Sequence, residues 1–363
     1  MLWFVLTTGA CNLRCRYCGG GFPDHVVPHR PRFTAEELAA FIRRVDRDPV
    51  VFFYGGEPLL NTALIRGLVD ELGGRARFGI QTNGTLHHLL GDEYWAAMDT
   101  VLLSIDGVEE VTDRWRGRGV YRRVVGALRR LLRLRRREGA PATIIARMTA
   151  TRDTVIDRDV LHLLGLGFDK AHWQLDAVWG EEWPVARWAE ESYLPGLRRL
   201  ARWVAEAPEE RLRRVVPFHG VVSRLLHGGD GWVPCGAGRG AFAVSSDGRV
   251  LACPIAVREG WAHLGDLWRG IDWEKARRLE GFIEECRRCP YFQVCGGRCL
   301  YAQAEKWYWS RERLQELDAA TRRFFDVVFA EVVPAVLRAI EEGRMSPGDA
   351  LYDPLLESTE VVP

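Results

Sequence analysis

The feature that most constrains the fold is a regular alternation of short apolar runs and longer amphipathic segments in the first half of the 363-residue chain. Each run is rich in β-branched or aromatic residues and is bounded by turn residues, which predicts a strand. The segments between the runs are long enough to be crossover helices, so we expect parallel strands. The expected strands are 2–7, 50–54, 77–81, 100–105, 143–149 and 171–176. One expected helix begins at a capping box, Thr34–Glu37. The other expected helices span 61–72, 92–98, 120–138 and 154–165.

Six strand–helix units predict an α/β fold, an open or partial (β/α)6 barrel. In barrels of this kind, ligands bind at the C-terminal ends of the strands. The residues that directly follow each expected strand are therefore the first candidates for a functional site.

Three cysteines directly follow the first expected strand, as Cys11, Cys15 and Cys18 in the sequence CNLRCRYC. Three thiolates can hold three irons of a [4Fe–4S] cube and leave the fourth iron open for a substrate or cofactor. Zinc is the alternative, because closely spaced cysteines also bind zinc. The spacing alone leaves both readings open.

Polar or glycine-rich turns follow the next three expected strands. The first is Gly55-Gly56-Glu57-Pro58, in which two glycines let the backbone approach a ligand and Glu57 supplies an acceptor for a cation. An ordinary turn with a solvated glutamate is the alternative. The other two turns are residues 81–84, QTNG, and residues 104–107, SIDG.

The triplet, the aromatic Tyr17 before its last cysteine and the GGEP turn together resemble the radical S-adenosylmethionine (SAM) enzymes. The resemblance implies that the triplet binds a [4Fe–4S] cluster whose open iron chelates SAM. Reductive cleavage of SAM would then give methionine and a 5′-deoxyadenosyl radical that abstracts hydrogen from a substrate. It also implies that SAM is bound by Tyr17, Gly55, Gly56, Glu57, Asn83, Ser104 and Arg116. For Arg116, a place on the solvated surface is the alternative.

A second group of six cysteines begins beside an expected hairpin, residues 241–251, and continues after an expected helix around 272–284. Its spacing resembles the SPASM extension, which carries auxiliary [4Fe–4S] clusters behind radical SAM domains that act on peptides and proteins. We expect one or two such clusters. The six cysteines are Cys235, Cys253, Cys286, Cys289, Cys295 and Cys299.

The ligand grouping within this second set stays open. The family pattern would place Cys235, Cys253 and Cys299 on one cluster and the other three cysteines on a second, each one thiolate short of four. Asp230, His227, Asp318 or the substrate could supply a fourth ligand. A single cluster on Cys235, Cys253, Cys286 and Cys289 is another option, and zinc is the third.

The expected domains are a radical SAM barrel over 1–180, a helical linker over 181–231, a SPASM-like iron–sulfur domain over 232–300, and a C-terminal helix and tail over 301–363. The helix includes Trp307-Tyr308-Trp309, and the tail from Tyr352 onward is either loosely held or laid back across the domain.

Composition excludes little. The net charge of +1 gives no reason to expect nucleic-acid binding, and the arginines of 129–137 are most simply the solvated face of a helix. A nucleic-acid patch or a docking site for an acidic leader peptide is the alternative for that helix. No apolar run approaches the ~20 residues that span a bilayer. No signal peptide is recognisable and there are nine cysteines, so we expect a cytoplasmic protein with metal chemistry and no membrane partner.

The resemblance implies an enzyme that modifies a ribosomally made peptide or protein by a thioether or carbon–carbon crosslink or a related oxidation. Its expected partners are that substrate, an electron donor such as a ferredoxin or flavodoxin, and a separate peptide-recognition protein. Cofactor or haem biosynthesis and sulfatase-type maturation are alternatives. The second is weakened because Pro254 stands where that branch has an aspartate base. A non-catalytic electron carrier is the contrasting class.

Overall fold

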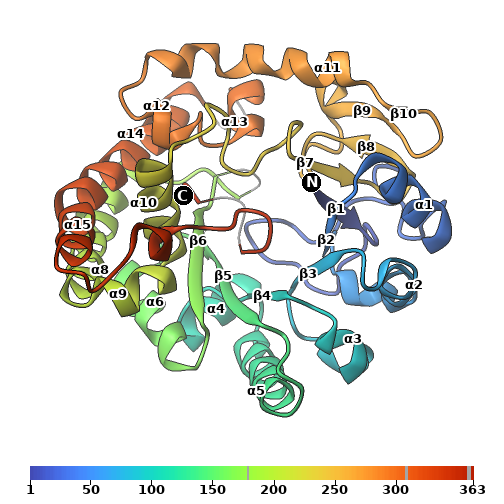
Figure 1. The fold of residues 1–363 in the computed structure, drawn as a ribbon, viewed down its shortest axis with the longest axis horizontal. Helices are drawn as coiled ribbons and strands as arrows, with labels where there is room; N and C mark the ends of the chain where they lie inside the picture. The colour runs from blue at the N-terminus through green and yellow to red at the C-terminus, as the bar shows by residue number, and fades with distance from the viewer. Residues whose placement is uncertain (178–179, 307–309, 358–360) are drawn as a thin grey trace.

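The computed structural model describes residues 1–177, 180–306, 310–357 and 361–363. The six expected strands are present and parallel, and they curve around the centre of the molecule with helices outside them (Figure 1). This confirms the α/β class and the open barrel. The strands are β1 (Leu2–Leu6), β2 (Val50–Tyr54), β3 (Arg77–Thr82), β4 (Thr100–Ser104), β5 (Thr143–Ala150) and β6 (Lys170–Leu175).

The crossover helices also lie where the apolar periodicity predicts them, with ends that differ by a few residues. The first begins after Thr34, and the predicted capping box is formed between Thr34 and Glu37. A short helix that the sequence analysis did not separate, α4, stands between β4 and the long basic helix. The helices are α1 (Ala35–Val45), α2 (Thr62–Leu72), α3 (Asp92–Ala96), α4 (Glu109–Arg116), α5 (Val120–Glu138) and α6 (Ile156–Gly165).

The predicted hairpin at 241–251 is present as β7 (Ala241–Val244) and β8 (Arg249–Leu251), and it does not form a separate sheet. Strand β7 pairs in parallel with β1, from Leu2 opposite Ala241 to Val5 opposite Val244. Strands β9 (His263–Asp266) and β10 (Gly270–Ile271) follow in antiparallel order. The described strands therefore form one ten-stranded sheet, ordered β10-β9-β8-β7-β1-β2-β3-β4-β5-β6.

The segment expected as a linker is a packed helical layer. Helix α10 (Val216–His227) has a largely buried surface, and Val215 just before it bridges to Ala171 of β6. The helix expected around 272–284 is α11 (Trp273–Arg278) continued by a 3₁₀ helix, Leu279–Arg288. Residues 307–309 lie outside the described residues. The other helices are α7 (Val185–Trp188), α8 (Leu194–Glu206), α9 (Pro208–Arg211), α12 (Phe292–Cys295), α13 (Leu300–Glu305), α14 (Arg311–Val327) and α15 (Val333–Glu341).

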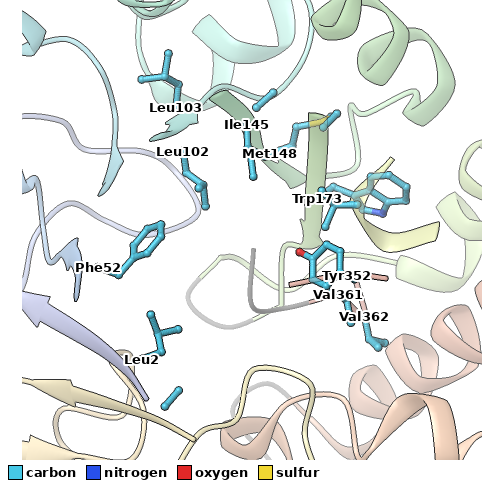
Figure 2. Close-up of a cluster of buried hydrophobic side chains, with 14 of the residues drawn as sticks. Leu2, Phe52, Leu102, Leu103, Ile145, Met148, Trp173, Tyr352, Val361 and Val362 are labelled. Atoms are coloured by element: carbon cyan, nitrogen blue, oxygen red, sulfur yellow. The ribbon is translucent and has the colours of Figure 1, made fainter. Parts of the chain in front are cut away.

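The C-terminal tail is laid back against the barrel. Figure 2 shows Tyr352, Val361 and Val362 beside Trp173 of β6, in the buried cluster that also contains side chains of β4 and β5. The Gln174 side-chain amide donates a hydrogen bond of 3.1 Å to the carbonyl oxygen of Val362. The tail thus covers the edge strand of the sheet. Among the described residues, no helix is both long and apolar enough to cross a bilayer.

Candidate active site at the open end of the barrel

The loop that carries the first cysteine triplet leaves the C-terminal end of β1. Cys15 is buried and Cys11 and Cys18 are partly buried. A tight turn holds the last two cysteines together, since the backbone amides of Cys18 and Gly19 donate to the carbonyl of Cys15 at 3.1 and 2.8 Å. The turn brings the thiols of Cys15 and Cys18 close enough for each to shift the pKa of the other.

The three thiols have different acidities. The hydrogen bond from Cys15 lowers the pKa of Cys18 to about 6. The same hydrogen bond, together with burial, raises the pKa of Cys15, and burial raises the pKa of Cys11. Cys18 is therefore the thiol that ionises first, and thiolates are the form that binds metal.

The two glycines after β2 bring this turn against the backbone just before Cys11. The amides of Gly56 and Glu57 donate to the carbonyls of Thr8 and Ala10 at 3.0 and 2.8 Å. A Cβ atom on Gly56 would lie 2.1 Å from the carbonyl oxygen of Ala10, and Gly55 has a positive φ of 132°. Only glycine fits both positions, because a side chain would force the two loops apart.

The carboxylate of Glu57 is buried, and it is bonded within the protein. Its Oε1 accepts from the Thr82 hydroxyl at 2.5 Å and from the backbone amide of Leu59 at 3.1 Å. Its Oε2 accepts from the backbone amide of Asn83 at 2.8 Å. Burial raises the pKa of Glu57 to about 7. Glu57 thus ties the end of β2 to the end of β3, a role that the sequence analysis did not foresee beside cation binding.

Arg116 at the end of α4 forms a buried two-bond ion pair with Asp106. Its Nε and Nη2 donate to the two carboxylate oxygens of Asp106 at 2.8 and 2.7 Å. The Tyr17 hydroxyl donates to the same carboxylate at 3.0 Å, and the guanidinium lies 5.4 Å from the centre of the Tyr17 ring. The ring of Trp115 stacks on Tyr17 at 6.1 Å. The predicted cofactor residues Arg116 and Tyr17 therefore also brace the cysteine loop.

One cavity of about 640 Å³ joins these features. Its wall includes a buried carboxyl at the end of β6, Asp176, whose pKa burial raises to about 7. The wall also includes Arg298, Cys299 and Tyr301 from the second cysteine region. The predicted residues that line the cavity are Cys11, Cys15, Tyr17, Cys18, Gly55, Gly56, Glu57, Asn83, Ser104 and Arg116.

The donor set and the space fit a cluster with a bound cofactor. Three thiols from one loop face a cavity with room for a further ligand, and soft thiolates are the ligands of iron–sulfur clusters. Among the described residues, no group of three or more cysteine, histidine or acidic side chains is arranged so that it could hold one metal ion.

The six later cysteines fall into two neighbourhoods. The pKa of Cys295 is raised by burial to about 11, and the thiols of Cys286 and Cys289 are close enough to act in the same direction. Burial raises the pKa of Tyr301 to about 12, and Cys253 and Cys299 contribute to that shift. Cys235 and Cys253 line a second cavity of about 60 Å³, which shares Tyr54, Gln81, Arg147 and Ile255 with the larger one.

The three candidate fourth ligands lie in different surroundings. Asp230 is 3.5 Å from the Arg224 guanidinium, and the His227 Nε2 is 3.0 Å from the carbonyl oxygen of Pro347. The charge of Asp318, in addition to burial, raises the pKa of Cys286, which puts this carboxylate near the group of Cys286.

Sequence reasoning missed the side chains that hold the motifs together. Asp106 appears in the sequence only as part of a turn, and its role depends on Arg116 ten positions later. Asn12 and Thr85 also went unnoticed, although they bridge the cysteine loop and the turn after β3. Asn12 lies inside the triplet, which was the one signal available for it.

Residues 5–162 match the Radical SAM superfamily. This part of the chain is a radical SAM domain. It spans β1 to α6 and so contains the cysteine triplet, the glycine turn and the ion pair at the mouth of the barrel.

Two relatives align over most of the length of this chain. Mycofactocin maturase MftC of Mycolicibacterium smegmatis is 24% identical over 327 residues, 82% of this chain and 77% of that protein. A cysteine-type anaerobic sulfatase-maturating enzyme of Clostridium perfringens is 23% identical over 360 residues, 90% of this chain and 95% of that one. The solved structure of native anSMEcpe with bound AdoMet and Cp18Cys peptide has a TM-score of 0.67 at 19% identity, covering 93% of this chain and 99% of that one, and it supports the fold.

Proposed function

We propose that this chain is a radical SAM enzyme that modifies a peptide or protein, by a crosslink or a related oxidation. The observation that carries the proposal is the shared cavity, which is lined at once by the triplet Cys11, Cys15 and Cys18 and by Cys299 of the second cysteine region. A substrate placed there would lie between two cluster sites.

In this proposal the triplet holds a [4Fe–4S] cluster that, when bound, supplies the electron for cleavage of SAM to methionine and the 5′-deoxyadenosyl radical. Ser104 and the backbone of Gly55 and Gly56 hold SAM in the cavity that they line. Arg116 contributes a positive charge to the same wall while it remains paired with Asp106. A reaction inside this cavity has less contact with water than one at the protein surface.

The second cysteine region carries auxiliary clusters in this proposal. One neighbourhood is formed by Cys286, Cys289 and Cys295, and the other contains Cys253 and Cys299 with Cys235 on the adjoining cavity. This division supports the two-cluster grouping over a single cluster on Cys235, Cys253, Cys286 and Cys289. A ferredoxin- or flavodoxin-like protein is the proposed electron donor, and a separate protein that recognises the peptide is a further proposed partner.

A peptide substrate is supported by what the relatives and neighbours are. One relative is a maturase, another matures sulfatases, and the structural neighbour was solved with a peptide bound. Sulfatase-type maturation is the second candidate because that relative aligns over 90% of this chain. Pro254 lines the smaller cavity where that branch is expected to carry its aspartate base.

The test is anaerobic reconstitution with iron and sulfide, followed by SAM, dithionite and measurement of 5′-deoxyadenosine. We expect product from the wild type and none from the variant with Cys11, Cys15 and Cys18 all changed to Ala. A matched control, Cys286→Ala with Cys289→Ala, removes two thiols from the other group and should keep SAM cleavage. A wild type that binds the cluster and SAM without forming product would favour an electron carrier.

A further inference from the structure

The outer face of the cysteine loop carries positive charge, whereas its inner face lines the cavity. The side chains alternate along the loop, so that Leu13, Cys15 and Tyr17 are buried and line the cavity. Arg14 and Arg16, which stand between them, are exposed. Because consecutive Cα atoms are about 3.8 Å apart, the backbone of Arg16 lies directly beside that of Cys15. The protein surface next to the triplet thiols is therefore basic.

Trp115 of α4 joins this loop to two further arginines. The backbone amide of Arg16 donates to the carbonyl oxygen of Trp115 at 2.9 Å. The guanidinium carbon of Arg152, shortly after β5, lies 5.6 Å from the centre of the Trp115 ring. Asp153 accepts from the Trp115 Nε1 and from the Arg114 Nη1, each at 2.9 Å. We call Arg16, Arg114 and Arg152 around Trp115 the basic patch.

The basic patch holds more positive than negative charge. Asp153 pairs with Arg114, whereas Arg16 and Arg152 are exposed and form no ion pair with any residue that the structure describes. The charge of Arg152 also acts on Asp176, which is buried in the wall of the cavity. The net charge of the whole chain is +1, so the excess at the basic patch is local.

Two other regions rich in arginine differ from the basic patch. Arg129 and Arg133 are exposed on α5, but this helix lies on the outside of the barrel and carries no cysteine (Figure 1). Beside Cys286 and Cys289, the segment 273–289 holds five basic and four acidic residues, so its charge nearly balances. The basic patch thus combines uncompensated charge with a position directly beside a cysteine triplet.

We propose that the basic patch is the docking site of an acidic electron-transfer protein. Complementary charge steers such a partner to the surface and fixes its orientation. The Trp115 ring stacks on Tyr17, so a partner on the patch contacts the loop that holds the thiols. With a flavodoxin as donor, one electron passes to the cluster on the triplet, and the anionic flavin hydroquinone becomes the neutral semiquinone without losing a proton. The inference rests on the proposed function and adds where its electron enters.

The test compares two reductants on the reconstituted enzyme, a photoreduced flavodoxin of negative net charge and dithionite. With limiting flavodoxin at low ionic strength, Arg16→Gln with Arg152→Gln should form 5′-deoxyadenosine about fivefold more slowly than the wild type, because losing rim charges lowers the association rate. The difference should shrink as salt rises, since salt screens exposed charges. Dithionite needs no docking surface, so its rate should not change. Binding of oxidised flavodoxin, followed by flavin fluorescence, should weaken in parallel and needs no turnover.

Two matched controls separate docking from a general effect of charge or folding. Arg129→Gln with Arg133→Gln removes the same charge from α5 and should leave both rates at the wild-type value. Arg16→Lys with Arg152→Lys keeps the charge of the basic patch and should restore the flavodoxin-driven rate.

Equal flavodoxin-driven rates in the wild type and in the Arg16→Gln, Arg152→Gln variant at low salt would overturn the inference. An equal fall in the dithionite-driven rate would overturn it too, because the two arginines would then act on the cluster itself. If poly-glutamate bound the patch and flavodoxin did not, the patch would belong to an acidic peptide instead. No product from the wild type with dithionite would refute the proposed function, and flavodoxin binding would still test the docking site.

Discussion

The cysteine loop 11–18 presents three thiols and the segment 279–299 presents four, and the protein holds the two regions in different ways. The loop is bonded to three neighbouring regions, through Ala10 to the glycine turn, through Asn12 to the turn after β3 and through Tyr17 to Asp106. The segment consists of a 3₁₀ helix, a four-residue helix and turns.

The difference indicates how much each site depends on its metal. Extended 3₁₀ helix has poor hydrogen-bond geometry, and a four-residue helix has few internal bonds, so the segment 279–299 has little stability of its own. Its outside supports come from side chains on other elements: the Arg224 Nε donates to the carbonyl of Val294 at 2.7 Å, and the Arg298 Nη1 donates to the Thr321 hydroxyl of α14 at 3.4 Å. We infer that the triplet site is built by the protein, whereas the later site is completed by its cluster.

The largest effect that tests this difference is expected when one partner of the buried ion pair between Arg116 and Asp106, which braces the cysteine loop, is removed. Asp106→Asn leaves Arg116, whose side chain is 7% exposed, without its charge partner. We expect a loss of about 3–5 kcal/mol in the free energy of unfolding, even without any cluster, because an unpaired buried charge is costly. Urea unfolding of the iron-free protein measures it.

The matched control is Glu191→Gln, which breaks an ion pair with Arg187 whose side chains are 76% and 63% exposed. This variant should unfold at nearly the wild-type urea concentration, since water screens exposed pairs. If both variants unfolded alike, the loop would not be held by its buried ion pair.

Iron removal should separate the two regions directly. Hydrogen exchange with and without bound clusters should show amides of 279–299 losing protection by about 100-fold on chelation, since weakly bonded segments open locally. Amides of β1 to β4 should change far less. Equal loss of protection in both regions would show that the triplet loop also needs its cluster to fold.

The smallest effect concerns His219, whose ring lies 5.2 Å from that of Tyr352 in the tail. Burial lowers the pKa of His219 on α10 to about 3. Between its unfolded pKa of about 6.5 and pH 3, the unfolded chain binds a proton that the folded chain does not, so stability falls as pH falls. The contribution lost from pH 7 to pH 5 is about 2 kcal/mol.

Urea unfolding of wild type and His219→Leu at pH 7 and pH 5 tests this assignment. The variant should lose less stability over that interval than the wild type, because the carboxyl groups that the two proteins share cancel in the comparison. An equal loss would mean that His219 is protonated in the folded state.

Much of the barrel could be predicted because its signals are local. The apolar runs of β1 to β6 and the periodicity of α5 depend on residues a few positions apart. The hairpin of β7 and β8 is predicted by the turn residues between its strands. The cysteine spacing and the GGEP turn indicated the kind of site for the same reason. The sequence also predicted that these motifs would meet, since parallel strands end at one edge.

Only the tertiary structure decided how the site is braced. Glu57, Asn83 and Arg116 were assigned to a cofactor from motif alone, and the fold supplies each with a protein partner far away in sequence or on another element. The fold also joined β7 to β1 and placed the tail on β6. Such pairings depend on which surfaces approach in three dimensions, and no local periodicity records that. The sequence by itself therefore determined the elements and the chemistry of the ligands, and the tertiary structure decided their partners.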